Sequence, residues 1–243
     1  MPKKKADPAS GRSGAPAPAL PYLHCLAHRG RLAIWQVDGD YVRKNVNEEF
    51  SNFGHHWTIK EIPEREIWLD QEAHPDEQRF FVRHALVERK LMERGKTYEQ
   101  ARIAADTIER EMRARAGDLA RARQGKEEVK PEAMHERLWK ALPSGLHVWV
   151  VDGRLVRSVY DVEFTEGGHD YVYEFVPPNE VWIDDDLHED ERGFVLFHEL
   201  HERNLMAQGM DYDSAHADSS RLERRYRNHP AQLHEALIQE GWA

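Results

Sequence analysis

The amino-acid sequence contains one unit twice, and this repeat constrains the fold more than any other feature of the chain. When the chain is shifted against itself by 114 positions, about eighty residues align without a gap. Matching segments include EIWLDQEAHPDE from Glu66 with EVWIDDDLHEDE from Glu180, and RHALVERKLMERG from Arg83 with FHELHERNLMAQG from Phe197. The number and order of the identities indicate a tandem duplication, so both halves are expected to share one fold.

Composition and the repeat divide the 243-residue chain into four segments. We expect a disordered tail over residues 1–20, an N-terminal repeat over 21–116, a helical linker over 117–142 and a C-terminal repeat over 143–243. The tail mixes Lys, Pro, Gly, Ser and Ala without an apolar core, and it lacks the apolar stretch of a secretory signal. The linker segment is highly charged and rich in helix-forming residues.

Charge and cysteine content exclude several classes of protein. The net charge of −10 argues against a nucleic-acid groove, because phosphate binding depends on Lys and Arg. No apolar run approaches the roughly 20 residues of a membrane helix. A single cysteine, Cys25, excludes an intrachain disulfide and a Cys-rich zinc finger, and it is compatible with a reducing cytosol. We therefore expect a cytoplasmic protein that acts on or binds a peptide or protein.

The first part of each repeat is expected to form a small antiparallel sheet. In the C-terminal repeat, Asp152-Gly153 separates two apolar segments, VWVV and RLVRSVY, as the two-residue turn of a hairpin would. The segment DYVYEFV over 170–176 alternates like a half-buried strand, and EVWID over 180–184 reads as a short strand after a pair of prolines.

The second part of each repeat is expected to form a pair of helices. From Glu189 the apolar residues recur at helical spacing, and Gly209 supplies a stop. A second helix is expected to begin near Asp211 and to run past Glu223. The fold class is therefore α+β, with two tandem copies of a small antiparallel sheet followed by a helix pair.

The first of these helices carries FHELHER, which has the residues of a metal site. His198 and Glu202 are four positions apart and so share one face of the helix. Zinc accepts both imidazole nitrogen and carboxylate oxygen, and it needs a third protein ligand. His216, early on the next helix, is the best-placed candidate, and Glu223 is a fourth ligand or an outer carboxylate that orients an imidazole. Zinc or another divalent metal is the expected cofactor.

Two other groups of residues offer competing metal sites. His198 and His201 are three positions apart, so His198, His201 and His216 form a rival histidine set. His201 is rotated from Glu202 by about 100° on the helix, which ranks this set second. The run 184–186 consists of three aspartates, which we interpret first as a solvated region before the helix and second as a calcium-like oxygen site.

The sequence HELHE resembles the HExxH motif of zincin-type metallopeptidases, with glutamate in place of the second histidine. The order of hairpin sheet, short strand EVWID and motif helix is also similar to the minimal zincin core, over about one repeat. In that family an edge strand holds the substrate beside the active-site helix. The resemblance implies that His198 is a metal ligand, that Glu199 is the general base, and that Glu202 takes the place of the missing histidine.

The N-terminal repeat serves as an internal control for this site. His198, Glu202 and Glu223 are matched by His84, Glu88 and Glu109, whereas Glu199, His201 and His216 are matched by Ala85, Val87 and Arg102. The base, the third ligand and the spare histidine are thus absent together, as in a degenerate copy of a catalytic site.

Three functions remain open on the sequence. The first is a metal-dependent, peptidase-like hydrolase that is active only in its C-terminal half. The second is a non-enzymatic, duplicated protein-binding module in which any metal is structural. The third is a di-metal centre in which His84, Glu88 and Glu109 supply the second half. Loss of the counterpart of Glu199 favours the first function, and survival of His84 and Glu88 favours the others.

Overall fold

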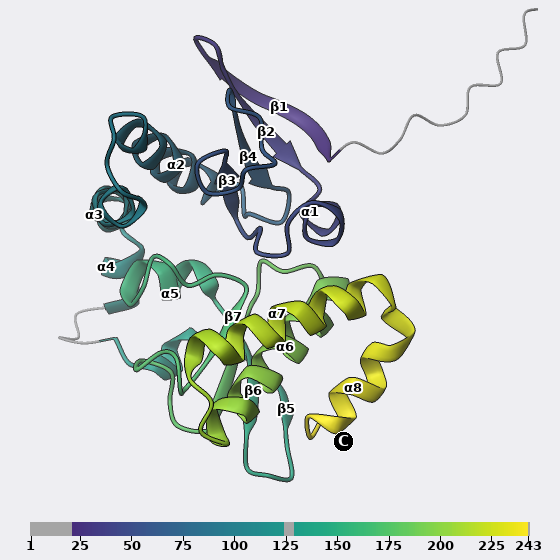
Figure 1. Ribbon diagram of the computed structural model, residues 1–243. Helices are drawn as coiled ribbons and strands as arrows, with labels where there is room; N and C mark the ends of the chain where they lie inside the picture. Colours follow the sequence, from purple (N-terminus) through teal and green to yellow (C-terminus); the bar gives the residue numbers. More distant parts are fainter. Residues whose placement is uncertain (1–20, 124–128, 243) are drawn as a thin grey trace, which may run out of the picture.

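The computed structural model describes residues 21–123 and 129–242 of the chain. The predicted tail over 1–20 lies outside the described residues, as does 124–128 of the predicted linker. Each half forms one α+β unit, and Figure 1 shows the N-terminal unit (purple and blue) above the C-terminal unit (teal to yellow). The α+β class with two tandem repeats is therefore confirmed.

Both repeats have the same order of elements: two strands, a short helix, two strands and two long helices. The N-terminal repeat consists of β1 (Tyr22–Arg29), β2 (Leu32–Val37), α1 (Gly39–Asn45), β3 (Phe53–His55), β4 (Glu66–Asp70), α2 (Gln78–Met92) and α3 (Tyr98–Ala116). The C-terminal repeat consists of β5 (His135–Ala141), β6 (His147–Val151), α5 (Gly153–Val159), β7 (Gly167–His169), β8 (Glu180–Asp184), α6 (Glu189–Ala207) and α7 (Tyr212–Asn228). The remaining elements are α4 (Asp118–Arg123), the 3-10 helices η1 (Pro131–Met134) and η2 (Pro230–Gln232), and α8 (Leu233–Gln239).

Each sheet has four strands and is mixed, whereas the sequence predicted antiparallel pairing throughout. The strand orders are β1-β2-β4-β3 and β5-β6-β8-β7. The two central strands pair in parallel, with Trp149 opposite Trp182, and the outer pairs are antiparallel. On one face of the second sheet, Val148 and Ile183 pack against Leu196 and Leu200 of α6.

The parallel pairing results from a helix where the sequence predicted a hairpin turn. The Asp152 side chain accepts a hydrogen bond from the Leu155 N–H at 2.7 Å and so caps α5. Because α5 carries the chain back along the sheet, β8 can run parallel to β6. Gly153 is needed here for close approach, since a Cβ at this position would collide with the Asp184 carboxylate.

Two further segments differ from the prediction. Residues 170–176 form turns and no strand, because the backbone N–H groups of Val172 and Tyr173 both donate to the His169 carbonyl, at 3.0 Å. The linker prediction is wrong for 135–141, which form the edge strand β5. Within the described residues, no helix is long and apolar enough to cross a membrane.

The predicted helix pair is present in the C-terminal repeat. The Asp211 side chain caps α7 by accepting the Ser214 N–H at 3.0 Å. Gly209 lies in the turn between α6 and α7 with φ +94°, a conformation that favours glycine. Because this turn is short, α7 folds back along α6, and the polar faces of the two helices meet.

The two repeats are held together by a buried, reciprocal network of ion pairs. Arg43 of α1 binds Asp70 of its own repeat at 2.6 Å and reaches Glu191 of the other repeat at 3.1 Å. In the matching position, Arg157 of α5 binds Asp184 of its own repeat and Glu77 of the other. Both arginines are almost fully buried. The interface therefore has the self-complementary form of a twofold dimer.

This network also corrects the prediction for the aspartate run at 184–186. Asp184 is 2% exposed and pairs with Arg157, and Asp186 lies 3.2 Å from the same guanidinium. These carboxylates are therefore parts of a buried interface and not of a solvated helix start.

Candidate metal site

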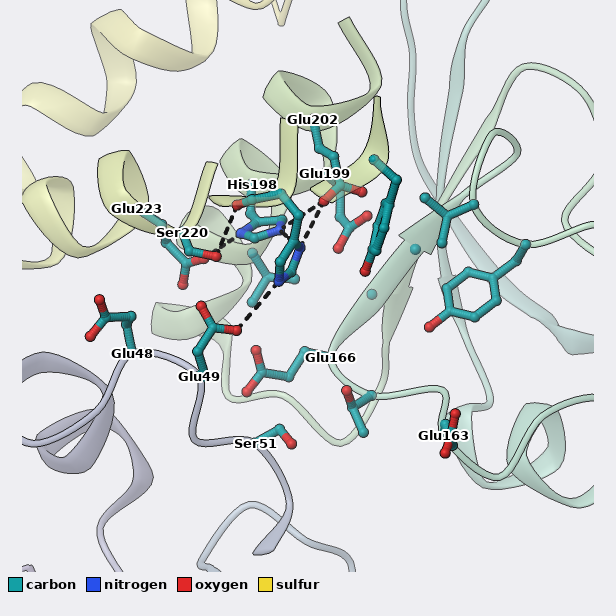
Figure 2. Close-up of a pocket in the computed structure, with 18 of the residues that line it drawn as sticks. Glu48, Glu49, Ser51, Glu163, Glu166, His198, Glu199, Glu202, Ser220 and Glu223 are labelled. Atoms are coloured by element: carbon teal, nitrogen blue, oxygen red, sulfur yellow. Dashed lines mark hydrogen bonds and ion pairs between the residues drawn. The ribbon is translucent and has the colours of Figure 1, made fainter. Parts of the chain in front are cut away.

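The site lies between α6 and α7 of the C-terminal repeat. Helix α6 carries His198, Glu199 and Glu202, and α7 carries His216 and Glu223. Figure 2 shows His198, Glu199, Glu202 and Glu223 gathered around one cavity.

Three atoms of the predicted ligands face one another at the centre of the site. His198 Nε2 lies 3.4 Å from Glu202 Oε2 and 3.2 Å from His216 Nδ1, and His216 Nδ1 lies 2.8 Å from the same oxygen. Tetrahedral ligands about 2.0–2.1 Å from a zinc ion are about 3.3–3.4 Å apart. The triangle thus has nearly the size of one face of a zinc tetrahedron.

The outer nitrogens of both imidazoles are held by carboxylates. His198 Nδ1 lies 2.9 Å from Glu223 Oε2, and His216 Nε2 lies 3.3 Å from Glu49 Oε2. An ionised carboxylate only accepts hydrogen bonds, so each outer nitrogen carries the N–H. By the same rule, the 2.8 Å contact with Glu202 gives His216 Nδ1 a proton in the metal-free protein. A metal ion in the triangle would replace that proton, and the outer N–H groups would leave His198 Nε2 and His216 Nδ1 as the ligand atoms.

The third ligand is oriented by a histidine that the sequence did not assign to the site. His169 Nε2 lies 3.0 Å from Glu202 Oε1, the oxygen that points away from the triangle. The Tyr171 N–H donates to His169 Nδ1 at 3.2 Å, so Nε2 carries the proton and donates to Glu202. His169, Glu199 and Glu202 also lie close enough to share an ion. The tautomer of His169 instead makes it a donor that orients Glu202.

The carboxylates around the triangle favour positive charge on its two histidines. Burial favours a neutral His198 ring, but the carboxylates of Glu202 and Glu223 outweigh it and raise the pKa of His198 well above its usual value. Hydrogen bonds to Glu202 and Glu49 raise the pKa of His216 to about 9. Burial opposes ionisation of Glu202, yet its three histidine partners lower the pKa of its carboxyl strongly. A divalent metal ion would satisfy the same acceptors that attract protons here.

Glu199 occupies a different environment from the ligands. Its side chain is buried beside the cavity, and burial raises the pKa of its carboxyl to about 7. Among the described residues, no hydrogen bond to this carboxylate is found. A carboxylate with a pKa near neutrality and no fixed partner is suited to accept and return a proton.

The cavity has a volume of about 320 Å³ and is lined by residues of both repeats. Its carboxylates are Glu48, Glu49, Glu163, Glu166, Glu199, Glu202 and Glu223, and its lining includes no Lys or Arg. Its floor includes Gly167 of the edge strand β7, which contacts α6. An acidic, partly enclosed cavity of this kind suits a metal ion with a neutral or cationic ligand.

Some backbone groups of the edge strand β7 are paired outside the sheet: the Gly167 N–H donates to the Thr165 carbonyl, and the His169 carbonyl accepts from Val172 and Tyr173. Among the described residues, the Gly167 carbonyl and the His169 N–H have no such partner. The Asp184 N–H donates to the Glu166 carbonyl at 2.8 Å, and the Asp170 N–H donates to the Glu180 carbonyl at 3.3 Å. Alternate residues bond across an antiparallel pair, so residues 167 and 169 direct their backbone polar groups away from β8. All three residues of β7 are buried, and Gly167 lines the cavity whereas His169 does not.

His201 does not join the triangle. Its Nδ1 lies 2.8 Å from Glu240 and its Nε2 lies 3.2 Å from Asp218, while its ring stacks on Phe197. Both ring nitrogens are thus occupied on another face of α6, so the rival histidine set is not assembled.

The matching region of the N-terminal repeat also contains a cavity, of about 600 Å³, but different side chains line it. Phe53 stands where the second repeat has Gly167, and its ring packs 5.0 Å from the His84 ring and against Ala85. Arg102 points to Glu99, Asp106 and Glu163, so no third ligand faces His84 and Glu88.

The predicted di-metal centre is not assembled either. Among the described residues, each group close enough to share an ion draws on one repeat only. The internal alignment contains the change from Phe53 to Gly167, which predicts a different lining beside the two motif helices. The contact of Glu49 with His216 could not be predicted from this alignment, because both repeats have glutamate at this position.

Comparison with known proteins gives no relative from which a role could be transferred to these residues. No family model, curated protein or solved structure matches this chain.

Proposed function

We propose that this protein is a metal-dependent hydrolase of peptidase-like type, with one site in its C-terminal repeat. Zinc, or another divalent ion, would be held by His198, Glu202 and His216. The observation that carries the proposal is the triangle of three inward-facing acceptors, spaced like a tetrahedral face and fixed from behind by Glu223, Glu49 and His169. Three protein ligands leave a fourth position free, as in catalytic zinc sites.

The cavity offers the remaining groups that amide hydrolysis requires. A bound zinc ion would polarise the scissile carbonyl and acidify a water molecule toward a pKa of about 7. Glu199 would take a proton from that water and pass it to the leaving nitrogen, which needs a carboxyl that titrates near neutrality. The Gly167 carbonyl, on a residue that lines the cavity, would accept a hydrogen bond from the substrate backbone, which favours a peptide or protein substrate.

The central test is Glu199→Gln. The amide keeps the size of the side chain but cannot accept a proton, so hydrolysis of any peptide substrate should fall by at least a hundredfold. Zinc content, measured by elemental analysis, should stay at about one ion per chain in this variant. His198→Ala should lose both zinc and activity.

Activity that persists unchanged in Glu199→Gln would remove the general-base role. Wild-type protein that binds no metal and cleaves no peptide in a substrate screen would instead favour a protein-binding module. One observation supports that second candidate: the pairs His84–Glu109 and His55–Glu88 persist at 2.8 and 3.0 Å in the repeat without a metal triangle. Such pairs can therefore serve structure alone.

A further inference from the structure

One wall of the metal-site cavity belongs to the N-terminal repeat. Glu49 lies in the loop between α1 and β3, and Figure 2 shows its side chain extending from that loop toward the histidines of the other repeat. Its Oε2 lies 3.3 Å from His216 Nε2, although the two residues are 167 positions apart. A contact over this separation exists only because the two repeats are docked.

The position of the Glu49 loop is fixed by the docking interface. Next to it, Glu48 forms an ion pair with Arg224 of α7 at 2.5 Å. Helix α1, which precedes the loop, packs directly on α7. The loop is therefore attached to the same helix that carries His216.

The mirror-image contact occurs at the other end of the interface. Glu163, which matches Glu49, pairs with Arg102, which matches His216. Each repeat thus extends one glutamate to the same position on the second long helix of its partner. Only one of these contacts ends on a residue of the metal triangle.

We propose that the N-terminal repeat completes the metal site of the C-terminal repeat, with Glu49 as the positioning residue for His216. This inference rests on the proposed metal site. The Glu49 carboxylate accepts the Nε2–H of His216 and so keeps the proton on Nε2 when the ion replaces the proton on Nδ1. The repeat that lacks the third ligand therefore retains a role in the site of the other.

The imidazole needs this support more than the other ligands do. His198 is held by the buried Glu223, whereas the His216 side chain is 35% exposed and can turn away from the cavity. Outer partners of metal-bound histidines typically change metal affinity by about 10- to 100-fold. Because the Glu49 side chain is itself 56% exposed, we expect an effect at the lower end of that range.

The experiment measures the zinc affinity of the full chain by competition with a chromophoric chelator. Glu49→Ala should weaken zinc binding by about tenfold. Glu49→Gln should weaken it less, because the amide oxygen can still accept the Nε2–H. Glu163→Ala is the matched control: it also removes one carboxylate of the cavity, but one that pairs with Arg102 and not with the triangle, so it should weaken zinc binding less than Glu49→Ala does. The absorption spectrum of Co²⁺-loaded protein should change in Glu49→Ala but not in Glu163→Ala.

The outcomes separate this inference from the proposed function. Wild-type protein that binds no zinc would overturn both. Wild-type protein that binds zinc, with equal affinities in Glu49→Ala and Glu163→Ala, would overturn only the role of Glu49. Thermal unfolding of the metal-free variants checks folding, and an equal midpoint in Glu49→Ala and wild type would assign any loss of zinc affinity to the site.

Discussion

At the scale of single residues, Gly167 distinguishes the cavity beside α6 from the cavity beside α2, where Phe53 stands at the matching position. A Cβ at this position would lie 3.0 Å from the Trp182 carbonyl oxygen, 3.1 Å from Glu199 Cγ and 3.1 Å from Val195 Cγ1. These distances are shorter than ordinary van der Waals contacts, so any side chain here must displace the proposed base or the strand. The N-terminal repeat has Phe53 at this position, and Phe53 lines the cavity of about 600 Å³ beside His84 and Glu88.

Gly167→Ala should therefore impair catalysis while leaving the metal ligands in place. We expect the methyl group to push Glu199 away from the water, lowering kcat by about tenfold or more, since small misplacements of a catalytic group cost up to about a hundredfold. Stability should fall by about 1–3 kcal/mol because the methyl group overpacks the site. Zinc content and peptide cleavage are the two measurements. A variant with unchanged kcat would show that Glu199 is not constrained by this strand.

At the scale of elements, the sequence predicted the helices, which depend on neighbouring residues, and missed the strand pairing, which depends on contacts between distant residues. Helices α6 and α7 were recognisable from apolar spacing, the Gly209 stop and the Asp211 cap, and these features placed His198, Glu202 and His216. The parallel pairing of β6 with β8 was not recognisable from the sequence, because an Asp-Gly pair occurs both in hairpin turns and at helix starts. The close packing of Gly153 against the Asp184 carboxylate favours the helix start over the hairpin turn.

A comparison of the two repeats predicts how a third ligand could be introduced on α3, at the position that matches His216. His84 and Glu88 persist on α2, and Glu163 already reaches the position where His216 has its outer partner. Arg102→His should therefore add a weaker second zinc site, raising the metal content toward about two ions per chain. Ala85→Glu alone should add none, because Arg102 would still occupy the place of a ligand. Elemental analysis of both variants tests this, and equal metal content would show that Phe53 closes the site.

At the scale of the whole molecule, the interface depends on carboxylates with opposite pKa shifts. Burial, together with the nearby Asp70, raises the pKa of Glu72 to about 7 despite its contact with Arg43. Burial opposes ionisation of Glu77 as well, but Arg157 and Arg113 lower its pKa to about 2. Glu77 therefore stabilises the folded state above its ordinary pKa of 4.5 and loses this effect as pH falls toward 2.

Glu72 affects the free energy of unfolding in the opposite sense to Glu77, and we expect this to give a measurable pH dependence. The folded protein retains the Glu72 proton up to about pH 7, whereas the ordinary pKa of glutamate is 4.5, so its contribution to stability is lost as pH rises between these values. In Glu72→Gln this contribution is absent. The free energy of unfolding should fall less between pH 5 and pH 8 in the variant than in wild type, as measured by urea denaturation. Glu61→Gln, at an exposed position, is the control, and equal slopes in all three proteins would contradict the assignment.

The reciprocal interface also bears on how such a protein can change over generations. Two unlinked copies of one repeat, docked in this way, would form a homodimer, and every substitution in the gene would alter both sites at once. Covalent linkage removes that coupling, so Arg102 and Phe53 can stand in one half while His216 and Gly167 stand in the other. The half without the triangle is still constrained by the ion pairs and the loop that it presents to its partner. Its ligand residues can therefore change, whereas the residues that dock it to the other repeat cannot.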